Sequence, residues 1–210
     1  MQISIRNNFP DIMRQVDGMT EQLRARVMAG AVNKTLDQAK TQMVREIAGE
    51  YSLKAGDVRQ ELAVVRASYR AGNIVLSGVL QAKGKRSRNI IRFIERAVSL
   101  AEGRRRKSAG TQRDLRFHIK RGGGKKSLPG AFIGNKGRTV FRRIPGSVAP
   151  SRAKYAGTKH AEAIEAISTI YVPSMFNAKR INLAVQRAIV ERFPTIFERE
   201  ARYILARFGA

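Results

Sequence analysis

The two ends of the chain carry the longest helical patterns in the sequence, and these patterns constrain the fold most. From 11 to 50, apolar residues recur every three or four positions, which is the spacing of one face of an α-helix. The same spacing returns from 181 to 208, where Pro194 is expected to end or kink the helix. The fold is therefore expected to begin and to close with a helix.

The apolar stripe of the first helical segment changes side near Gly30. Earlier apolar residues, from Ile12 to Val27, lie within a sector of about 80° on a helical wheel, and later ones, from Met28 to Ile47, lie roughly opposite. Two alternatives remain: the helix kinks at the glycine, or one long helix offers its halves to different neighbours. The second alternative would suit an oligomer.

Short strands are predicted between the helical ends, because apolar and polar residues alternate there. One predicted hairpin turns at residues 71–73, and another turns at Asn135, Lys136 and Gly137. The predicted strand segments are 63–68, 73–80, 115–120, 131–134, 138–144 and 167–172, the last ending before Pro173. Ser52 is expected to cap a short helix that reaches about Leu62. The segment 89–101 reads equally well as a helix or a strand.

The length of 210 residues and the 43% of apolar residues predict one substantial core. We therefore predict a single α+β domain over 1–210, with a long N-terminal helix, a small antiparallel sheet with hairpins and a C-terminal helix. A basic, glycine-rich loop is expected to form a flexible arm around 103–128.

The chain is strongly basic, and its positive charge is concentrated in one window. Lys and Arg number 41 against 16 Asp and Glu, which gives a formal net charge of +25. Residues 103–159 hold 17 of these basic residues and a single acid, Asp114. Such a field attracts polyanions or acidic protein surfaces, and by itself it says nothing about the fold.

Missing residue types exclude several kinds of chemistry. The chain has no cysteine, which excludes disulfides, thiolate zinc sites and a cysteine nucleophile. No stretch approaches the roughly 18 to 20 consecutive apolar residues of a membrane span, and the first residues lack the apolar core of a secretory signal. We expect a soluble protein that is made and used in a cytoplasm and has no cofactor.

The glycine-rich run RGGGKK, residues 121–126, has three interpretations: a phosphate-binding loop, an unstructured arm, or the tip of a hairpin. A P-loop needs a hydroxyl residue directly after its lysine, whereas Lys126 follows Lys125, and the next residues do not open a helix. We therefore reject nucleotide binding. We predict a flexible tip or arm in front of a strand that starts at the turn 128–130.

No catalytic constellation is visible. The only histidines are His118 and His160, and His118 falls on the polar face of a predicted strand, which favours a solvated or ring-contacting side chain. Glu162 and Glu165 have the i, i+3 spacing of helical metal ligands, but two acids and one histidine near a loop are usually a solvated turn. We predict that the protein is not an enzyme and holds no metal.

Aromatic residues interleave with the basic ones, as they do in strands that bind nucleic acids. They share strand faces with aliphatic residues too irregularly for a stacking platform, so we favour the core for them. These residues are Tyr69, Phe117, Phe132 and Phe141. The basic window leaves three alternatives: direct contact with DNA or RNA, lining of a lumen through which DNA passes, or docking on an acidic neighbouring subunit.

Three segments, taken in order, are more specific. They are AGAVNKTLDQAKTQMVREI, SLPGAFIGNKGRTVFRRI and IYVPSMFNAKRINLAVQRAIVERFP. Over roughly residues 25–205, the chain resembles the prophage minor tail protein Z family of long-tailed phages. The sharpest element, and the candidate family signature and assembly segment, is Pro129, Gly130, Ala131, Phe132 and Ile133.

The resemblance implies a structural virion protein at the head-proximal end of the tail, a tail-completion or neck protein that helps to join tail and head. It also implies a homo-oligomeric ring around the DNA channel, with a hexamer as the expected form and other tail and neck proteins as partners. Non-specific contact with genomic DNA and assembly in the host cytoplasm belong to the same expectation. The family has no catalytic residues to carry over. Our candidate DNA-facing or docking residues are Arg104, Arg105, Arg106, Lys107, Arg121, Lys125, Lys126, Arg138, Arg142 and Arg143.

Overall fold

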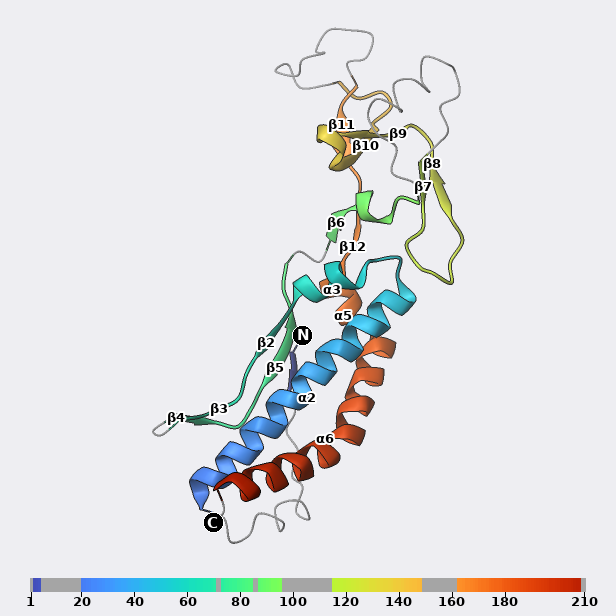
Figure 1. Ribbon diagram of the computed structural model, residues 1–210. Helices are drawn as coiled ribbons and strands as arrows, with labels where there is room; N and C mark the ends of the chain where they lie inside the picture. The colour runs from blue at the N-terminus through green and yellow to red at the C-terminus, as the bar shows by residue number, and fades with distance from the viewer. Residues whose placement is uncertain are drawn as a thin grey trace. The chain divides into compact units, whose positions relative to one another are not determined.

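A computed structural model describes residues 2–4, 20–70, 73–84, 87–95, 115–148 and 162–208 of the chain (Figure 1). The chain divides into two compact units: unit 1 is 1–48, 54–84 and 172–210, and unit 2 is 49–53 and 85–171. Long helices at both ends and short antiparallel strands between them confirm the predicted α+β class. That the whole chain is a single domain stays a prediction.

Two long helices and a small sheet build unit 1 (Figure 1). The helices are α2, Glu21–Glu50, whose last two residues belong to unit 2, α3, Ala55–Glu61, α5, Val172–Phe176, and α6, Lys179–Phe208. The strands are β1, Gln2–Ser4, β2, Leu62–Val65, β3, Ser68–Arg70, β4, Asn73–Val75, and β5, Val79–Ala82. They form an antiparallel sheet in the order β1-β5-β2 and a β3-β4 hairpin, which confirms the first predicted hairpin.

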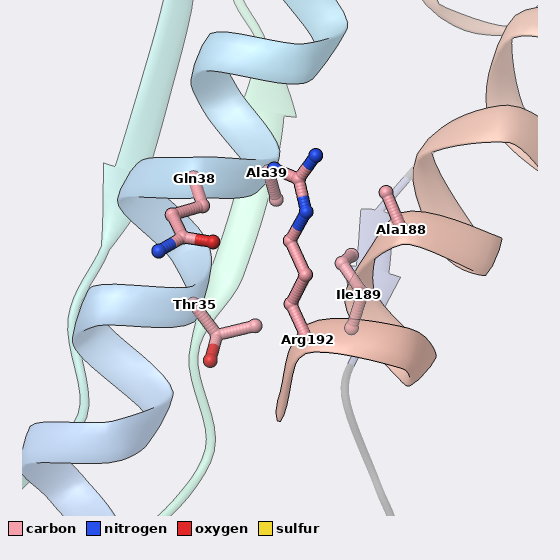
Figure 2. Close-up of a pocket in the computed structure, with 6 residues that line it drawn as sticks. All are labelled: Thr35, Gln38, Ala39, Ala188, Ile189 and Arg192. Atoms are coloured by element: carbon pink, nitrogen blue, oxygen red, sulfur yellow. The ribbon is translucent and has the colours of Figure 1, made fainter. Parts of the chain in front are cut away.

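Helix α2 is continuous through Gly30, so the change of apolar face does not mark a break. On one side, Leu36 approaches Gly78, in the link between β4 and β5. On another side of the helix, Ala39 lines a narrow crevice together with Ile189 of α6 (Figure 2). Both neighbours of α2 therefore lie within the same chain, and the two apolar faces no longer argue for an oligomer. The predicted helical residues 11–19 lie outside the described residues.

The core of unit 1 is formed by the helices and the sheet together. Leu36, Met43, Leu80, Phe176 and Phe197 are fully buried and come from α2, β5, α5 and α6. Burying each such side chain contributes about 1.5–3 kcal/mol, which offsets the entropy lost when these elements become ordered.

Helix α6 contains Pro194 and still runs to Phe208. Proline has no N–H to donate to the carbonyl of Val190 one turn earlier, so the helix loses one hydrogen bond there. Figure 1 shows the second half of α6 running in a different direction from the first. Of the two predicted outcomes, the proline bends the helix and does not end it.

Gly30 allows α2 and α6 to approach closely. A Cβ atom at this position would lie 2.5 Å from Oε2 of Glu200, a buried carboxylate that pairs with Nζ of Lys34. The glycine thus makes room for a polar contact between the helices, although glycine costs a helix interior about 1 kcal/mol relative to alanine.

This arrangement predicts that Gly30→Ala is nearly neutral by itself, with a change in unfolding free energy below about 1 kcal/mol, because the gain in helix propensity is offset by displacement of the carboxylate. In a Glu200→Ala background the same substitution should stabilise by about 1 kcal/mol. Urea unfolding of the four proteins of this cycle measures the coupling. Equal effects of Gly30→Ala in both backgrounds would contradict the close approach.

Short strands and two 3₁₀ turns make up the described part of unit 2. The strands are β6, Ser87–Asn89, β7, Leu115–Phe117, β8, Lys126–Leu128, β9, Ala131–Gly134, β10, Thr139–Arg143, β11, Ile164–Ala166, and β12, Ser168–Ile170. The 3₁₀ turns are η1, Ile90–Phe93, and η2, Asn135–Gly137. Strands pair as β11-β10-β9, β12-β6 and β7-β8, all antiparallel.

Several sequence predictions about this region can now be judged. The second predicted hairpin is confirmed as β9-η2-β10, and the ambiguous segment after Asn89 opens as η1. Residues 103–114 of the predicted arm lie outside the described residues, while 115–128 form the β7-β8 hairpin with RGGGKK leading from one strand into the other. The predicted Ser52 cap is wrong: Lys54 precedes α3 without a side-chain cap, and Ser52 contacts His118 instead. Among the described helices, none has an apolar stretch long enough to cross a bilayer.

Candidate nucleic-acid and assembly surfaces

The side chain of Asn89 holds the centre of strand β10. Its Nδ2 donates to the carbonyl of Val140 at 3.0 Å, and its Oδ1 accepts from the Val140 N–H at 2.8 Å and from the Ile91 N–H at 3.2 Å. The Ile167 N–H also donates to the Val140 carbonyl, at 3.0 Å. Val140 is fully buried, so these bonds satisfy backbone groups that water does not reach.

Beyond this anchored strand, the β9-β10 hairpin ends in a tip with an unusual backbone. Asn135, Lys136 and Gly137 have φ values of 49°, 54° and 84°, all in the left-handed region. Asparagine and glycine tolerate this region, but lysine does so only at a cost. The side chains of Lys136 and Arg138 are exposed.

One face of the hairpin carries two phenylalanines that contact each other. Phe132 and Phe141 lie opposite each other in the register, with ring centroids 5.9 Å apart and ring planes 28° apart. The guanidinium of Arg143 lies 5.8 Å from the centre of the Phe132 ring. A Cβ at Gly134 would lie 2.9 Å from two Phe141 ring carbons, so only glycine fits against that ring. The rings are half-buried, so the prediction that they belong to the core is met only in part.

Three cations of unit 2 are paired with glutamates. Lys120 Nζ lies 3.6 Å from Oε1 of Glu50, and Arg142 Nη2 lies 2.6 Å from Oε1 of Glu165. Lys125 Nζ donates to Glu95, and this hydrogen bond lowers the pKa of the Glu95 carboxyl below its ordinary value. Within the described residues, Lys126, Lys136 and Arg138 form no such pair with an acid.

The predicted DNA-facing or docking residues therefore separate into classes. Arg104, Arg105, Arg106 and Lys107 lie outside the described residues. Arg121 donates from Nε to the Tyr51 carbonyl, and Lys125 and Arg142 are ion-paired. Lys126 and Arg138 are exposed, and Arg143 packs on a ring. Arg142 and Arg143 are consecutive on β10, so their side chains point to opposite faces of the strand.

Sequence reasoning placed Lys136 in a turn but did not include it among the functional candidates. The signal was present, because a basic residue in the middle of a predicted Asn-Lys-Gly turn occupies the hairpin tip. The signature residues of the resemblance have a structural position: Pro129 and Gly130 form the turn before β9, with Gly130 at φ 69°, and Ala131 is buried.

His118 connects three backbone segments. Its Nε2 lies 3.1 Å from the Gly123 carbonyl and its Nδ1 lies 3.3 Å from Oγ of Ser52. Because a carbonyl only accepts, Nε2 carries a hydrogen and donates it to the Gly123 carbonyl. The ring positions the RGGGKK turn. Glu165 lies in a strand, and no group of three metal-ligating side chains occurs among the described residues.

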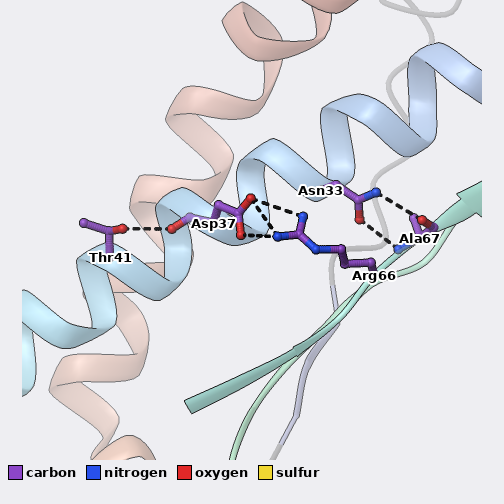
Figure 3. Close-up of polar contacts among 5 residues, drawn as sticks. All are labelled: Asn33, Asp37, Thr41, Arg66 and Ala67. Atoms are coloured by element: carbon purple, nitrogen blue, oxygen red, sulfur yellow. Dashed lines mark hydrogen bonds and ion pairs between the residues drawn. The ribbon is translucent and has the colours of Figure 1, made fainter. Parts of the chain in front are cut away.

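The AVNKTLDQAK segment of α2 supplies polar anchors for unit 1 (Figure 3). The Asn33 side chain donates to the Ala67 carbonyl at 3.0 Å and accepts from its N–H at 2.9 Å. One turn later, the Asp37 carboxylate accepts hydrogen bonds from Nη1 and Nη2 of Arg66, at 2.9–3.2 Å. These contacts attach α2 to the link between β2 and β3.

A cluster of aromatic and arginine side chains lies where the first turns of α2 meet β3 and the end of α6. The guanidinium of Arg26 lies 3.9 Å from the centre of the Phe208 ring and 5.5 Å from that of Tyr69. Arg207 lies 5.5 Å from the Phe208 ring and 5.9 Å from the Tyr203 ring. The rings remain exposed, Tyr69 at 45%, Tyr203 at 51% and Phe208 at 38%. We call these five residues the aromatic-arginine patch.

Comparison with known proteins supports the sequence resemblance. The family model of prophage minor tail protein Z matches residues 10–208, nearly the whole chain. No curated protein and no solved structure matches the chain. The match includes the Asn33 anchor, the β9-β10 hairpin and both long helices. The chain therefore belongs to the prophage minor tail protein Z family, whose members are structural proteins of the phage tail.

Proposed function

We propose that the chain is a tail-completion or neck subunit that assembles into a ring, a hexamer by analogy, at the head-proximal end of the tail and helps to join tail and head. Family membership supports a place in the virion tail. The observation that carries the assembly step is the aromatic-arginine patch.

Exposed aromatic side chains beside arginines, as in the aromatic-arginine patch, are suited to contacts between proteins. Tyrosine, phenylalanine and arginine are enriched at interfaces, and buried tyrosine and arginine account for much of the binding energy. In unit 1 the patch gathers three exposed rings around two guanidinium groups. Burying these rings against a partner would remove a large apolar area from water at little cost in side-chain entropy.

Helix α6 supplies a second, different apolar surface. Leu183 and Val190 are 52% and 55% exposed and lie seven residues apart, which puts them on the same side of the helix. Two different surfaces on one subunit permit head-to-tail contacts, which close into a ring when the rotation between subunits allows it. Copies of this chain and other tail and neck proteins are the proposed partners.

We further propose that the protein acts by assembly and without catalysis, cofactor or metal, and that assembly takes place in the host cytoplasm. The described histidine serves structural contacts, because the ring of His118 contacts Ser52 and Gly123. An assay of the purified protein for DNA hydrolysis tests this assignment, and we expect no hydrolysis.

Binding of nucleic acid is the second candidate, and the charge of unit 2 favours it. The described residues of unit 2 include 11 Lys or Arg and four Glu, three of which are already ion-paired. The surplus gives this unit a positive field that attracts polyanions. In the ring proposal the same field faces DNA on its way through the channel.

The assembly proposal is tested by the mass of the protein in solution, measured by light scattering at physiological salt with and without duplex DNA. We expect a discrete closed oligomer without DNA. The double variant Tyr69→Ala/Tyr203→Ala should shift the mass towards the monomer, because two exposed rings of the interface are lost. Val148→Ala, which truncates an 84% exposed side chain of unit 2, is the control and should leave the mass unchanged.

The outcomes separate the two candidates. A monomer that becomes large only with DNA would favour the nucleic-acid binder. A monomer under both conditions, with no affinity for tail-tube or terminator proteins, would reject the ring. An oligomer that persists in the double variant would remove the aromatic-arginine patch from its interface.

A further inference from the structure

We propose that the tip of the β9-β10 hairpin, through Lys136 and Arg138, contacts the phosphate backbone of duplex DNA. This inference rests on the proposed function, in which DNA passes the assembled protein, and it names the residues that meet the DNA. Charge, backbone conformation and rigidity of the hairpin support it independently.

The first support is the pattern of ion pairs. Lys120, Lys125 and Arg142 each have a glutamate of the same unit beside them, so much of their charge is already neutralised. Among the described residues, Lys136 and Arg138 have no acidic partner and both are exposed. An unpaired exposed cation binds a phosphate without first giving up an internal partner, and it releases a counterion from the DNA when it does so.

The second support is the backbone of the tip. Lys136 has φ 54° and ψ 38°, between Asn135 and Gly137, which are also left-handed. Glycine would adopt this conformation without strain, whereas a lysine there is strained. A strained residue at an exposed tip indicates that its side chain, and not its backbone, is what the position requires. An ammonium group is the only chemical function that this side chain offers.

The third support is the rigidity of the hairpin behind the tip. Asn89 fixes the middle of β10, and the stacked Phe132 and Phe141 join the two strands. Gly134, the residue before the tip, packs directly against the Phe141 ring. The two cations are therefore held on a pre-organised support, which reduces the entropy lost on binding.

The same rings explain why the duplex backbone is the favoured ligand. Single-strand binders offer free aromatic faces on which bases stack. Here Phe132 has Phe141 and Arg143 beside its ring, and Phe141 has Phe132 and Gly134. These contacts and the half-buried state of both rings leave less ring surface for stacking than a single-strand binder offers, so we assign the contact to the phosphates of a duplex.

The test is binding of a fluorescent duplex of about 30 base pairs, followed by anisotropy over a range of salt concentrations. For the double variant Lys136→Ala/Arg138→Ala, we expect the slope of log K against log salt to become shallower by about 1.8, because each phosphate contact contributes about 0.9. Affinity at physiological salt should fall on the order of tenfold. Light scattering of each variant establishes that its assembly state is unchanged.

Arg187→Ala/Arg199→Ala is the matched control. Both arginines are exposed on α6 of unit 1, and the variant loses the same net charge. Its slope should stay within about 0.5 of the wild type. If both double variants reduce the slope equally, binding follows net charge and the tip is not the contact. Preferential binding of single strands that is lost in Phe132→Leu would also overturn the proposal, because bases would then stack on the rings.

A single substitution separates binding from folding. Lys136→Gly removes the cation and the left-handed strain together, so we expect weaker DNA binding with thermal stability equal to or above that of the wild type. Unchanged DNA binding by this variant would overturn the role of Lys136. The assembly measurement is independent of the binding measurement. If the protein is a monomer but the tip substitutions still weaken DNA binding, the proposed function alone is rejected. If the protein forms the closed oligomer but does not bind DNA, only this inference is rejected.

Discussion

Replacing Asn89 with alanine is expected to lower the free energy of unfolding by about 3 kcal/mol, the larger of our two main stability predictions. The substitution removes three hydrogen bonds and leaves the N–H groups of Val140 and Ile91 without an acceptor. An unsatisfied buried donor costs about 1–3 kcal/mol, and Val140 is fully buried. Its carbonyl keeps the bond from Ile167.

Denaturant unfolding measures the total effect, and amide hydrogen exchange at Val140 locates it. Asn89→Asp is the matched comparison, because a carboxylate still accepts from both N–H groups, while its second oxygen faces the Val140 carbonyl in place of the donor. We expect the Val140 N–H to stay protected from exchange in the aspartate variant and to lose protection in the alanine variant. Equal loss of protection in both variants would contradict the acceptor role of Asn89.

Gly78→Ala is expected to lower the unfolding free energy by about 2 kcal/mol, within the range for overpacking a close-packed core. A Cβ there would overlap Cδ1 of Leu36 and lie 3.1 Å from Cγ1 of Val32 and 3.3 Å from the Val65 carbonyl oxygen. Leu36 is fully buried, so its displacement would disturb the packing of the core around it. The cost arises from close packing of the β4-β5 link on α2.

The melting temperature should fall by about 4–8 °C for a chain of this size. Gly56→Ala provides the control in the same unit, since a Cβ in α3 at that position meets nothing within 4 Å. It should be neutral or slightly stabilising because alanine favours a helix. A melting temperature for Gly78→Ala equal to that of the control would refute the close approach of the β4-β5 link to α2.

Several features of the fold were predictable because they depend on neighbouring residues alone. The 3.6-residue period located α2 and α6, and alternation with an Asn-Lys-Gly turn located the β9-β10 hairpin. The prediction that Ser52 caps a helix failed because a serine hydroxyl can bind a distant side chain instead of the backbone at the start of the next helix. Here the imidazole of His118, 66 residues away, binds the hydroxyl instead.

The candidate site was predictable only in part. Composition showed that the charge is positive, and the alternating pattern within the basic window predicted the hairpin that carries part of it. Neither showed which lysines and arginines are paired with a glutamate. Arg142 and Arg138 look alike in the sequence, yet Glu165 comes to lie beside Arg142 across the β10-β11 pair. The aromatic-arginine patch was missed for the same reason, because Arg26, Tyr69 and Phe208 are far apart along the chain.

By itself, the sequence determined the α+β class, the long terminal helices, the turn at 135–137 and the positive charge, because periodicity, turn chemistry and composition are local properties. Only the tertiary structure decided why Gly30 and Gly78 are glycines, which carbonyl Asn89 binds, and which lysines and arginines remain unpaired. These depend on contacts between residues distant in the chain, and such contacts form only where packing of the helices and strands brings those residues together.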